Sequence, residues 1–169
     1  VLHQIGSHGP SYYLRYPQAL ERFQPACRTA DFSDCTAQEV TNAYDNTIAY
    51  TDKVLADLID LLAMQEGLST SLIYVSDHGE SLGEKGLYLH GAPYFMAPDE
   101  QTKVPMLIWM SDGYQSDTGA NLECLTAGPT ADYSHANLFH TLLGMTGVET
   151  SLRDPELDIF DTCRKTSNG

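Results

Sequence analysis

The chain has 169 residues, 42% of them apolar, and carries 9 Lys and Arg against 23 Asp and Glu, a formal net charge of -14. This length and composition predict one globular domain, or part of one, with a real hydrophobic core. The negative charge argues against a nucleic-acid surface and against electrostatic docking on an anionic membrane, because both need clustered cations. No apolar run approaches the length that crosses a bilayer, so this piece is expected to be soluble.

The chain opens directly on VLHQI, residues 1–5, an alternating pattern typical of a strand, with no signal peptide before it. We interpret this start as a cut inside a larger domain. His3 lies within the expected strand and is predicted to be a packed core residue. The Gly-, Pro- and Tyr-rich segment 5–17 cannot form a regular helix and indicates a functional loop, in which His8 lies between two glycines.

The four cysteines, at positions 27, 35, 124 and 163, contain no C-x-x-C pair of the kind that marks zinc ribbons. Cys27 and Cys35 bracket a short polar loop and are expected to form a disulfide. A second bridge, between Cys124 and Cys163, would tie the tail to the domain. Such bridges would place the protein in an oxidising compartment, for example a bacterial periplasm. Four buried free thiols remain the alternative.

A long helix is predicted to begin at a capping box, in which Thr36 is followed three residues later by Glu39. Apolar residues recur at helical spacing after it, and the helix is expected to end near Gly67. Three polar residues within it are interpreted as a solvated or edge face: Asp45, Asn46 and Asp52.

The apolar run at residues 72–75 predicts a buried strand that stops at Asp77 and His78. Ligand sites of open α/β sheets lie at the carboxyl ends of strands. A carboxylate and an imidazole side by side on a turn can both reach one cation, and zinc accepts this mixture of ligands. Gly79 is expected to supply the backbone angles that the turn requires.

The rest of the chain predicts a long loop, a strand and a helix. The loop at 82–101 carries His90, and the run at 104–110 suits a strand in a sheet covered on both faces. Ser134 is a candidate cap for a helix at 135–145, whose histidines, His135 and His140, are interpreted as surface or packing residues. The last four residues, 166–169, are expected to be disordered.

Imidazoles and carboxylates therefore come from three loops that should meet at one edge of a parallel sheet: His8, Asp77, His78, Glu80 and His90. Histidines together with carboxylates suit one tetrahedral zinc site. A second, looser zinc beside it is an open alternative, and such a pair clamps a phosphoryl group during in-line displacement.

The segments at 44–62, 70–91 and 104–110 together resemble the alkaline-phosphatase and sulfatase superfamily, whose metal site follows such a strand. A narrower resemblance rests on residues 3–17, with Cys27 and Cys35 behind them, and on NLFHTLLGMTGVET near the end. These segments are similar to the periplasmic catalytic domain of lipid A phosphoethanolamine transferases, the group that includes the mobilised colistin-resistance enzymes. The resemblance covers almost the whole chain.

The resemblance implies an α/β fold with a mostly parallel sheet covered by helices on both faces. Residues 1–169 would be the C-terminal portion of one periplasmic catalytic domain, whose N-terminal half and inner-membrane anchor precede this chain. Asp77 and His78 would be ligands of a firmly bound zinc. His8 and His90 would line the site as phosphate or second-metal ligands, and Glu80 would support the shell around them. These three residues would act in catalysis.

The resemblance also implies a threonine nucleophile and a glutamate zinc ligand upstream of this chain. The donor would be phosphatidylethanolamine and the acceptor a lipid A phosphate, and the product would confer polymyxin and colistin resistance. A monomer is expected that contacts the membrane through the missing segment and binds no nucleic acid; this fragment alone would be inactive. A sulfatase or phosphatase, a phosphoglycerol transferase and a non-catalytic zinc-binding module are the alternatives.

Overall fold

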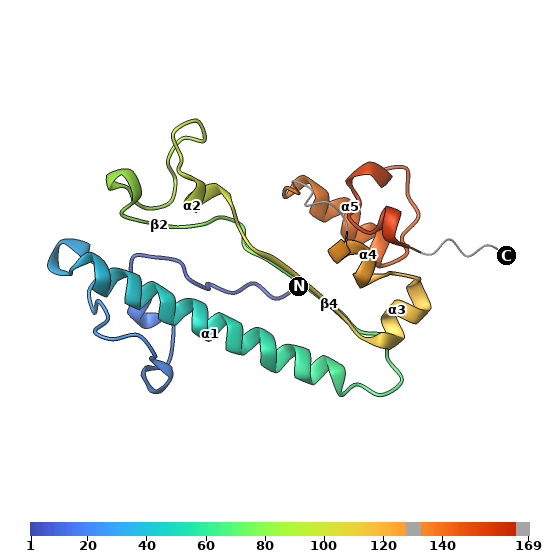
Figure 1. Ribbon diagram of the computed structural model, residues 1–169, viewed down its shortest axis with the longest axis horizontal. Helices are drawn as coiled ribbons and strands as arrows, with labels where there is room; N and C mark the ends of the chain where they lie inside the picture. The colour runs from blue at the N-terminus through green and yellow to red at the C-terminus, as the bar shows by residue number, and fades with distance from the viewer. Residues whose placement is uncertain (128–132, 165–169) are drawn as a thin grey trace. The chain divides into compact units, whose positions relative to one another are not determined.

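The computed structural model describes residues 1–127 and 133–164. Its helices and strands follow one another along the chain as drawn in Figure 1: α1 (Ala37–Ala63), β1 (Ser71–Val75), β2 (Ser81–Leu82), β3 (Tyr88–Leu89), α2 (Asp99–Thr102), β4 (Met106–Met110), α3 (Asp112–Thr118), α4 (Leu122–Ala127) and α5 (Ala136–Met145). Contacts divide the chain into two compact units. The first unit comprises Val1–Leu61 and Tyr74–Leu107, and the second comprises Leu62–Ile73 and Ile108–Gly169.

Helix α1 begins at the predicted capping box, which is confirmed. The backbone N–H of Thr36 donates to Glu39 Oε2 at 2.7 Å, and the N–H of Glu39 donates to Thr36 Oγ1 at 3.2 Å. This reciprocal pair gives partners to amides that the start of a helix otherwise leaves free. The helix ends at Ala63, before the expected stop, and Gly67 adopts a φ of 73° in the turn that follows.

The interpretation of Asn46 as part of a solvated face of α1 is wrong. Its side chain is fully buried. Its amide oxygen accepts from the backbone N–H groups of Arg22 and Phe23 at 2.7 and 2.9 Å, and its amide nitrogen donates to Phe23 O at 2.9 Å. A buried amide is stable when its hydrogen bonds are satisfied in this way. Asn46 therefore fixes the loop before the helix.

The core of the first unit joins the opening loop, the Cys27–Cys35 loop, α1 and the β2–β3 pair. Its buried members are Tyr12, Cys27, Val40 and Ala43, and its partly buried members include Phe32, Tyr44, Leu82 and Leu89. The ring of Tyr12 stacks on Phe32 with a centroid distance of 5.6 Å, and the ring of Tyr44 meets it edge-on at 5.5 Å. Stacked and edge-on arrangements are the favourable geometries of aromatic pairs.

Both expected disulfides are present, so the alternative of four free thiols is wrong. Cys27 and Cys35 have Cα atoms 5.7 Å apart, and Cys124 and Cys163 have Cα atoms 5.6 Å apart. The first bridge closes a loop within the first unit and the second ties the tail to α4 within the second unit. These spacings are typical of disulfides.

The second unit has its own apolar core, formed by Met110, Tyr114, Ala120, Met145, Ile159 and Phe160. Helix α5 begins at Ala136, so it starts later than the sequence predicted. The N-cap is His135 and not Ser134, so the predicted cap is wrong, although the hydroxyl of Ser134 accepts from the N–H of Ala136 at 3.3 Å. His140 takes a packing role, because its Nδ1 accepts from the N–H of Asp154 at 2.8 Å.

Strands β1 and β4 are hydrogen-bonded neighbours, and β2 pairs with β3 in antiparallel register, with Ser81 opposite Leu89. The ends of β1 and β4 are joined by bonds from Ser76 N to Pro105 O, at 3.4 Å, and from Ser111 N to Thr70 O, at 3.0 Å. The residue numbers at the ends of β1 rise from 70 to 76 while those of their partners at the ends of β4 fall from 111 to 105, which is the order of an antiparallel pair. The parallel strands expected for the sheet are therefore not among the described pairs.

The predicted opening strand is wrong, since residues 1–5 have no regular structure and His3 is exposed. A strand needs a hydrogen-bonding partner, and none pairs with this segment within 1–127 and 133–164. In those same ranges, no helix combines the length and the hydropathy that a membrane span requires. The expectation of disorder at 166–169 lies outside the described residues.

Candidate metal and phosphoryl site

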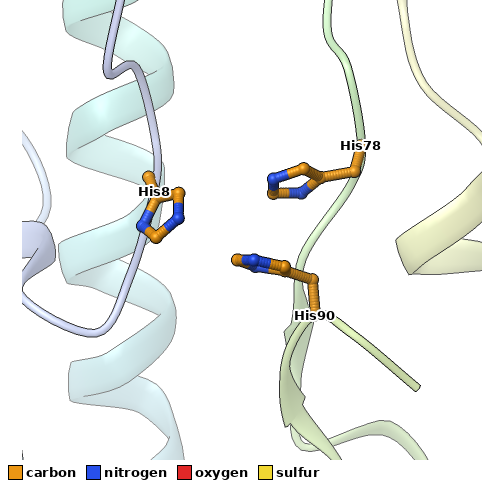
Figure 2. Close-up of side chains that lie close together, drawn as sticks. All are labelled: His8, His78 and His90. Carbon is orange, nitrogen blue, oxygen red and sulfur yellow. The ribbon is translucent and has the colours of Figure 1, made fainter.

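Three histidines meet in the first unit. His8 faces His78 and His90, as Figure 2 shows, and one nitrogen from each ring lies within 4.8 Å of the others. The rings of His78 and His90 have centroids 3.9 Å apart, and the His8 ring meets that of His90 edge-on at 4.9 Å. The expectation that these loops converge is confirmed for the three imidazoles, although antiparallel strands and a loop bring them together.

Each histidine comes from a different local structure. His8 lies in the turn of the opening loop, where its N–H donates to Ile5 O at 3.2 Å and its carbonyl oxygen accepts from Arg15 Nε at 3.1 Å. His78 follows β1, and His90 follows β3 directly. The residue before His90, Leu89, has a φ of 64°, in a region that residues other than glycine seldom adopt. Such backbone conformations cluster at functional sites.

The Nδ1 atom of every imidazole in this group has a hydrogen-bond partner. His8 Nδ1 lies 2.7 Å from Gly9 O, His78 Nδ1 lies 2.9 Å from Gly79 O, and His90 Nδ1 lies 2.5 Å from Glu80 Oε1. A carbonyl or carboxylate oxygen only accepts, so Nδ1 carries the hydrogen in each neutral ring. The lone pair is then on Nε2, and this is the tautomer in which a histidine binds a metal through Nε2.

Asp77 lies beside His78 but is not a member of the three-histidine group. Its side chain is 81% exposed, and its Oδ1 lies 3.9 Å from His78 Nε2. Zinc–nitrogen and zinc–oxygen bonds are each about 2.0–2.2 Å long, so two atoms at that separation can both bind one ion. The donor set of oxygen and imidazole nitrogen fits zinc, and the lone-pair nitrogens that it needs are available.

Glu80 is buried and has both carboxylate oxygens engaged. Oε2 accepts from the hydroxyl of Tyr12 at 2.5 Å and Oε1 pairs with His90 Nδ1. Burial, and then the bond to Glu80, raise the pKa of the Tyr12 hydroxyl above its ordinary value, so it stays a donor. No pattern in the sequence pointed to Tyr12. The opening loop contains two adjacent tyrosines, and the structure distinguishes them: Tyr12 is buried and bonded to Glu80, whereas Tyr13 is only partly buried.

Gly79 is required for a reason that the sequence analysis did not give. Its φ is not positive, so the expected need for special backbone angles is wrong. A methyl group at this position would overlap the carbonyl oxygen of Glu100. The N–H of Gly79 also donates to Gln101 O at 3.0 Å. Only a residue without a side chain permits this close approach of the loop after β1 to helix α2.

Residues 1–148 match the Sulfatase family, and the chain belongs to that family. The match confirms the predicted superfamily and, with the solved structure below, the α/β fold class.

Within this family the chain is similar to phosphoethanolamine transferases. It is 51% identical to phosphoethanolamine transferase EptA from Escherichia coli K12 over 99% of this chain and 31% of that protein. It is 36% identical to the Kdo(2)-lipid A phosphoethanolamine 7''-transferase of the same organism, over 87% of this chain and 26% of the relative. The soluble domain of lipooligosaccharide phosphoethanolamine transferase A from Neisseria meningitidis superposes with a TM-score of 0.93 at 42% identity, covering 97% of this chain and 50% of that one.

These similarities confirm the resemblance to lipid A phosphoethanolamine transferases that the sequence motifs indicated. The chain spans between a quarter and a third of the length of these two curated relatives.

Proposed function

We propose that this chain is the C-terminal portion of the catalytic domain of a periplasmic, inner-membrane-anchored enzyme that moves phosphoethanolamine from phosphatidylethanolamine to a lipid A phosphate. The observation that carries the proposal is the convergence of His8, His78 and His90 in a chain so similar to named phosphoethanolamine transferases. The two disulfides support an oxidising compartment.

In this proposal Asp77 and His78 hold zinc, because their ligand atoms are close enough to share one ion. Zinc, when bound, lowers the pKa of a coordinated hydroxyl and so generates a nucleophile at neutral pH. His8 and His90 bind the phosphoryl oxygens or a second, looser ion. The nitrogens of the three rings lie within 4.8 Å of one another, so one phosphoryl oxygen or one ion can contact more than one of them.

The nucleophile is a threonine outside this chain, whose oxygen attacks the phosphorus of phosphatidylethanolamine. The bond from phosphorus to the diacylglycerol oxygen breaks, and that oxygen takes up a proton, for which His8 and His90 are the candidate donors. An oxygen of a lipid A phosphate then attacks the phosphorus of the phosphothreonine. The bond from phosphorus to the threonine oxygen breaks, and that oxygen takes up a proton. The product carries a new positive amine on an anionic lipid, which weakens binding of cationic peptides such as colistin.

The test uses a chimaera in which this chain replaces the matching 169 residues of E. coli EptA. It is produced in cells whose own lipid A carries no phosphoethanolamine. Mass spectrometry of the lipid A is expected to show added phosphoethanolamine, and trapped enzyme is expected to contain a phosphorylated threonine. Release of free phosphate or sulfate from soluble esters, with unmodified lipid A, would instead establish a hydrolase and end the transferase proposal.

Replacing Asp77 or His78 by Ala is expected to lower zinc affinity by at least an order of magnitude, because each change removes one of few protein ligands. Elemental analysis of the purified proteins after dialysis against a metal buffer measures the effect. Asp52→Ala is the matched control, since Asp52 is an exposed aspartate on α1 of the same unit. Equal zinc contents in Asp77→Ala, Asp52→Ala and the unaltered protein would remove Asp77 from the ligand set.

A further inference from the structure

The carboxylate of Glu80 is held from both ends. The side chain is only 4% exposed; its Oε2 accepts from the Tyr12 hydroxyl and its Oε1 accepts from His90 Nδ1, each at 2.5 Å. An ionised carboxylate only accepts, so both partners must donate. A buried carboxylate is stable when it has such partners. Tyr12, Glu80 and His90 therefore form one hydrogen-bonded chain of side chains from the core of the first unit to the site.

The support of His90 differs from that of its two neighbours. His8 and His78 are held by the carbonyl oxygen of the next residue, which is part of the same loop. His90 is held by a side chain ten positions away, and that side chain is held by Tyr12, which lies 68 positions from Glu80. The orientation of the His90 ring therefore depends on tertiary contacts rather than on its own backbone.

The side chain of Tyr12 is immobilised by packing. It is 1% exposed, and its ring stacks on Phe32 at an interplanar angle of 15°. Phe32 lies between Cys27 and Cys35, so the disulfide-closed loop covers one side of the tyrosine ring. A side chain packed this closely keeps a single rotamer. The phenol oxygen therefore offers its hydrogen at one place only.

We infer that Tyr12 is a positioning residue for the reaction: its hydroxyl fixes the Glu80 carboxylate, which holds the hydrogen of His90 on Nδ1 and points Nε2 at the three-histidine group. This inference rests on the proposed function, because the reaction in which His90 takes part is the proposed phosphoethanolamine transfer. It assigns Tyr12 no contact with the substrate. Partners that orient a functional histidine from behind typically contribute factors of about 10 to 100 to activity.

Tyr12→Phe removes the hydroxyl and keeps the ring, so the stack on Phe32 remains. In the chimaera, this variant is expected to transfer phosphoethanolamine about 10-fold to 100-fold more slowly. Tyr44→Phe is the matched control, because Tyr44 belongs to the same core and packs on Tyr12 without a bond to Glu80 among those found for the described residues. The control is expected to keep its rate within about two-fold, as is usual for a substitution that removes no specific contact.

A double-mutant cycle separates positioning from general loosening of the fold. If Tyr12 acts through His90, Tyr12→Phe has no further effect in a His90→Ala background. Equal rate losses in both backgrounds would refute the inference. They would leave the proposed function intact, provided that the unaltered chimaera is active.

A readout independent of activity completes the test. Nitrogen-15 spectra of the histidine rings in the 169-residue chain, with circular dichroism as the fold control, are expected to show His90 with its hydrogen on Nδ1. In Tyr12→Phe the ring is expected to populate both tautomers. If the tautomer changes in this way but the unaltered chimaera transfers nothing, Tyr12 still fixes the His90 ring through Glu80, and it is the proposed function that fails. An unchanged tautomer in folded Tyr12→Phe would refute the inference.

Discussion

His90→Ala is expected to lower phosphoethanolamine transfer by the chimaera on the order of 100-fold or more. Loss of a positioned phosphate-binding or acid–base group has effects of this size. The His90 ring lies against those of His78 and His8, and its Nδ1 is already engaged by Glu80. The Nε2 atom is therefore the part of the ring available to substrate. The rate of lipid A modification, followed by mass spectrometry, measures the loss.

One further variant, with a matched control, identifies which nitrogen of His90 the transfer requires. His90→Asn offers an amide that can donate to Glu80 but has nothing in place of Nε2, so it should lose as much activity as His90→Ala. His3→Ala is the matched control, because His3 is an exposed histidine in the same unit and outside the three-histidine group. It should transfer at the unaltered rate. An active His90→Asn protein would show that the ring serves only to pair with Glu80.

Gly79→Ala is expected to disrupt the site even though Gly79 is not itself a ligand. The added methyl group overlaps the carbonyl oxygen of Glu100, which is backbone and cannot rotate away. Relief of the overlap requires the loop after β1 to move from α2, which breaks the bond from Gly79 N to Gln101 O. Overpacking of this kind costs about 1–3 kcal/mol, and more when backbone must shift. His78 and Glu80 move with the loop.

Chemical denaturation and zinc analysis of Gly79→Ala measure these two consequences. Both the free energy of unfolding and the zinc content should fall. Gly113→Ala in α3 is the matched control, since a methyl group there meets Ser69 Oγ at 3.5 Å, an ordinary contact. Alanine favours a helix over glycine, so the control should be at least as stable as the unaltered protein. A Gly79→Ala protein with unchanged stability and zinc content would contradict the close approach to Glu100.

Local patterns were sufficient for much of this fold. The capping box at Thr36 and Glu39 acts through bonds three residues apart, and the structure contains both of them. The apolar runs around β1 and β4 predicted strands at those places, and both formed. The histidines of the site were predicted because each lies in a loop at or after a strand or beside glycines. Interactions within a few residues are encoded by neighbours in the sequence, so sequence patterns reveal them.

The errors arose where a residue's role depends on a distant partner. The segment 1–5 has the alternation of a strand, but alternation does not supply a pairing strand. Asn46 reads as a surface residue on a helix, yet its amide satisfies backbone groups more than 20 positions earlier. Gly79 was interpreted through its own backbone angles, whereas its requirement comes from Glu100.

The sequence by itself determined the local framework of this protein: the long capped helix, the two longer strands and the histidines that the site would use. It predicted the two cysteine pairs but left free thiols open. Only the tertiary structure decided which nitrogen of the His90 ring faces the site, because that depends on the carboxylate of Glu80, whereas His8 and His78 pair with the carbonyl oxygen of the next residue. It also decided that Tyr12 and His90 share the carboxylate of Glu80. A hydrogen bond between groups 68 residues apart forms only when packing brings both groups to the same buried place, and no local pattern of residues records that distance.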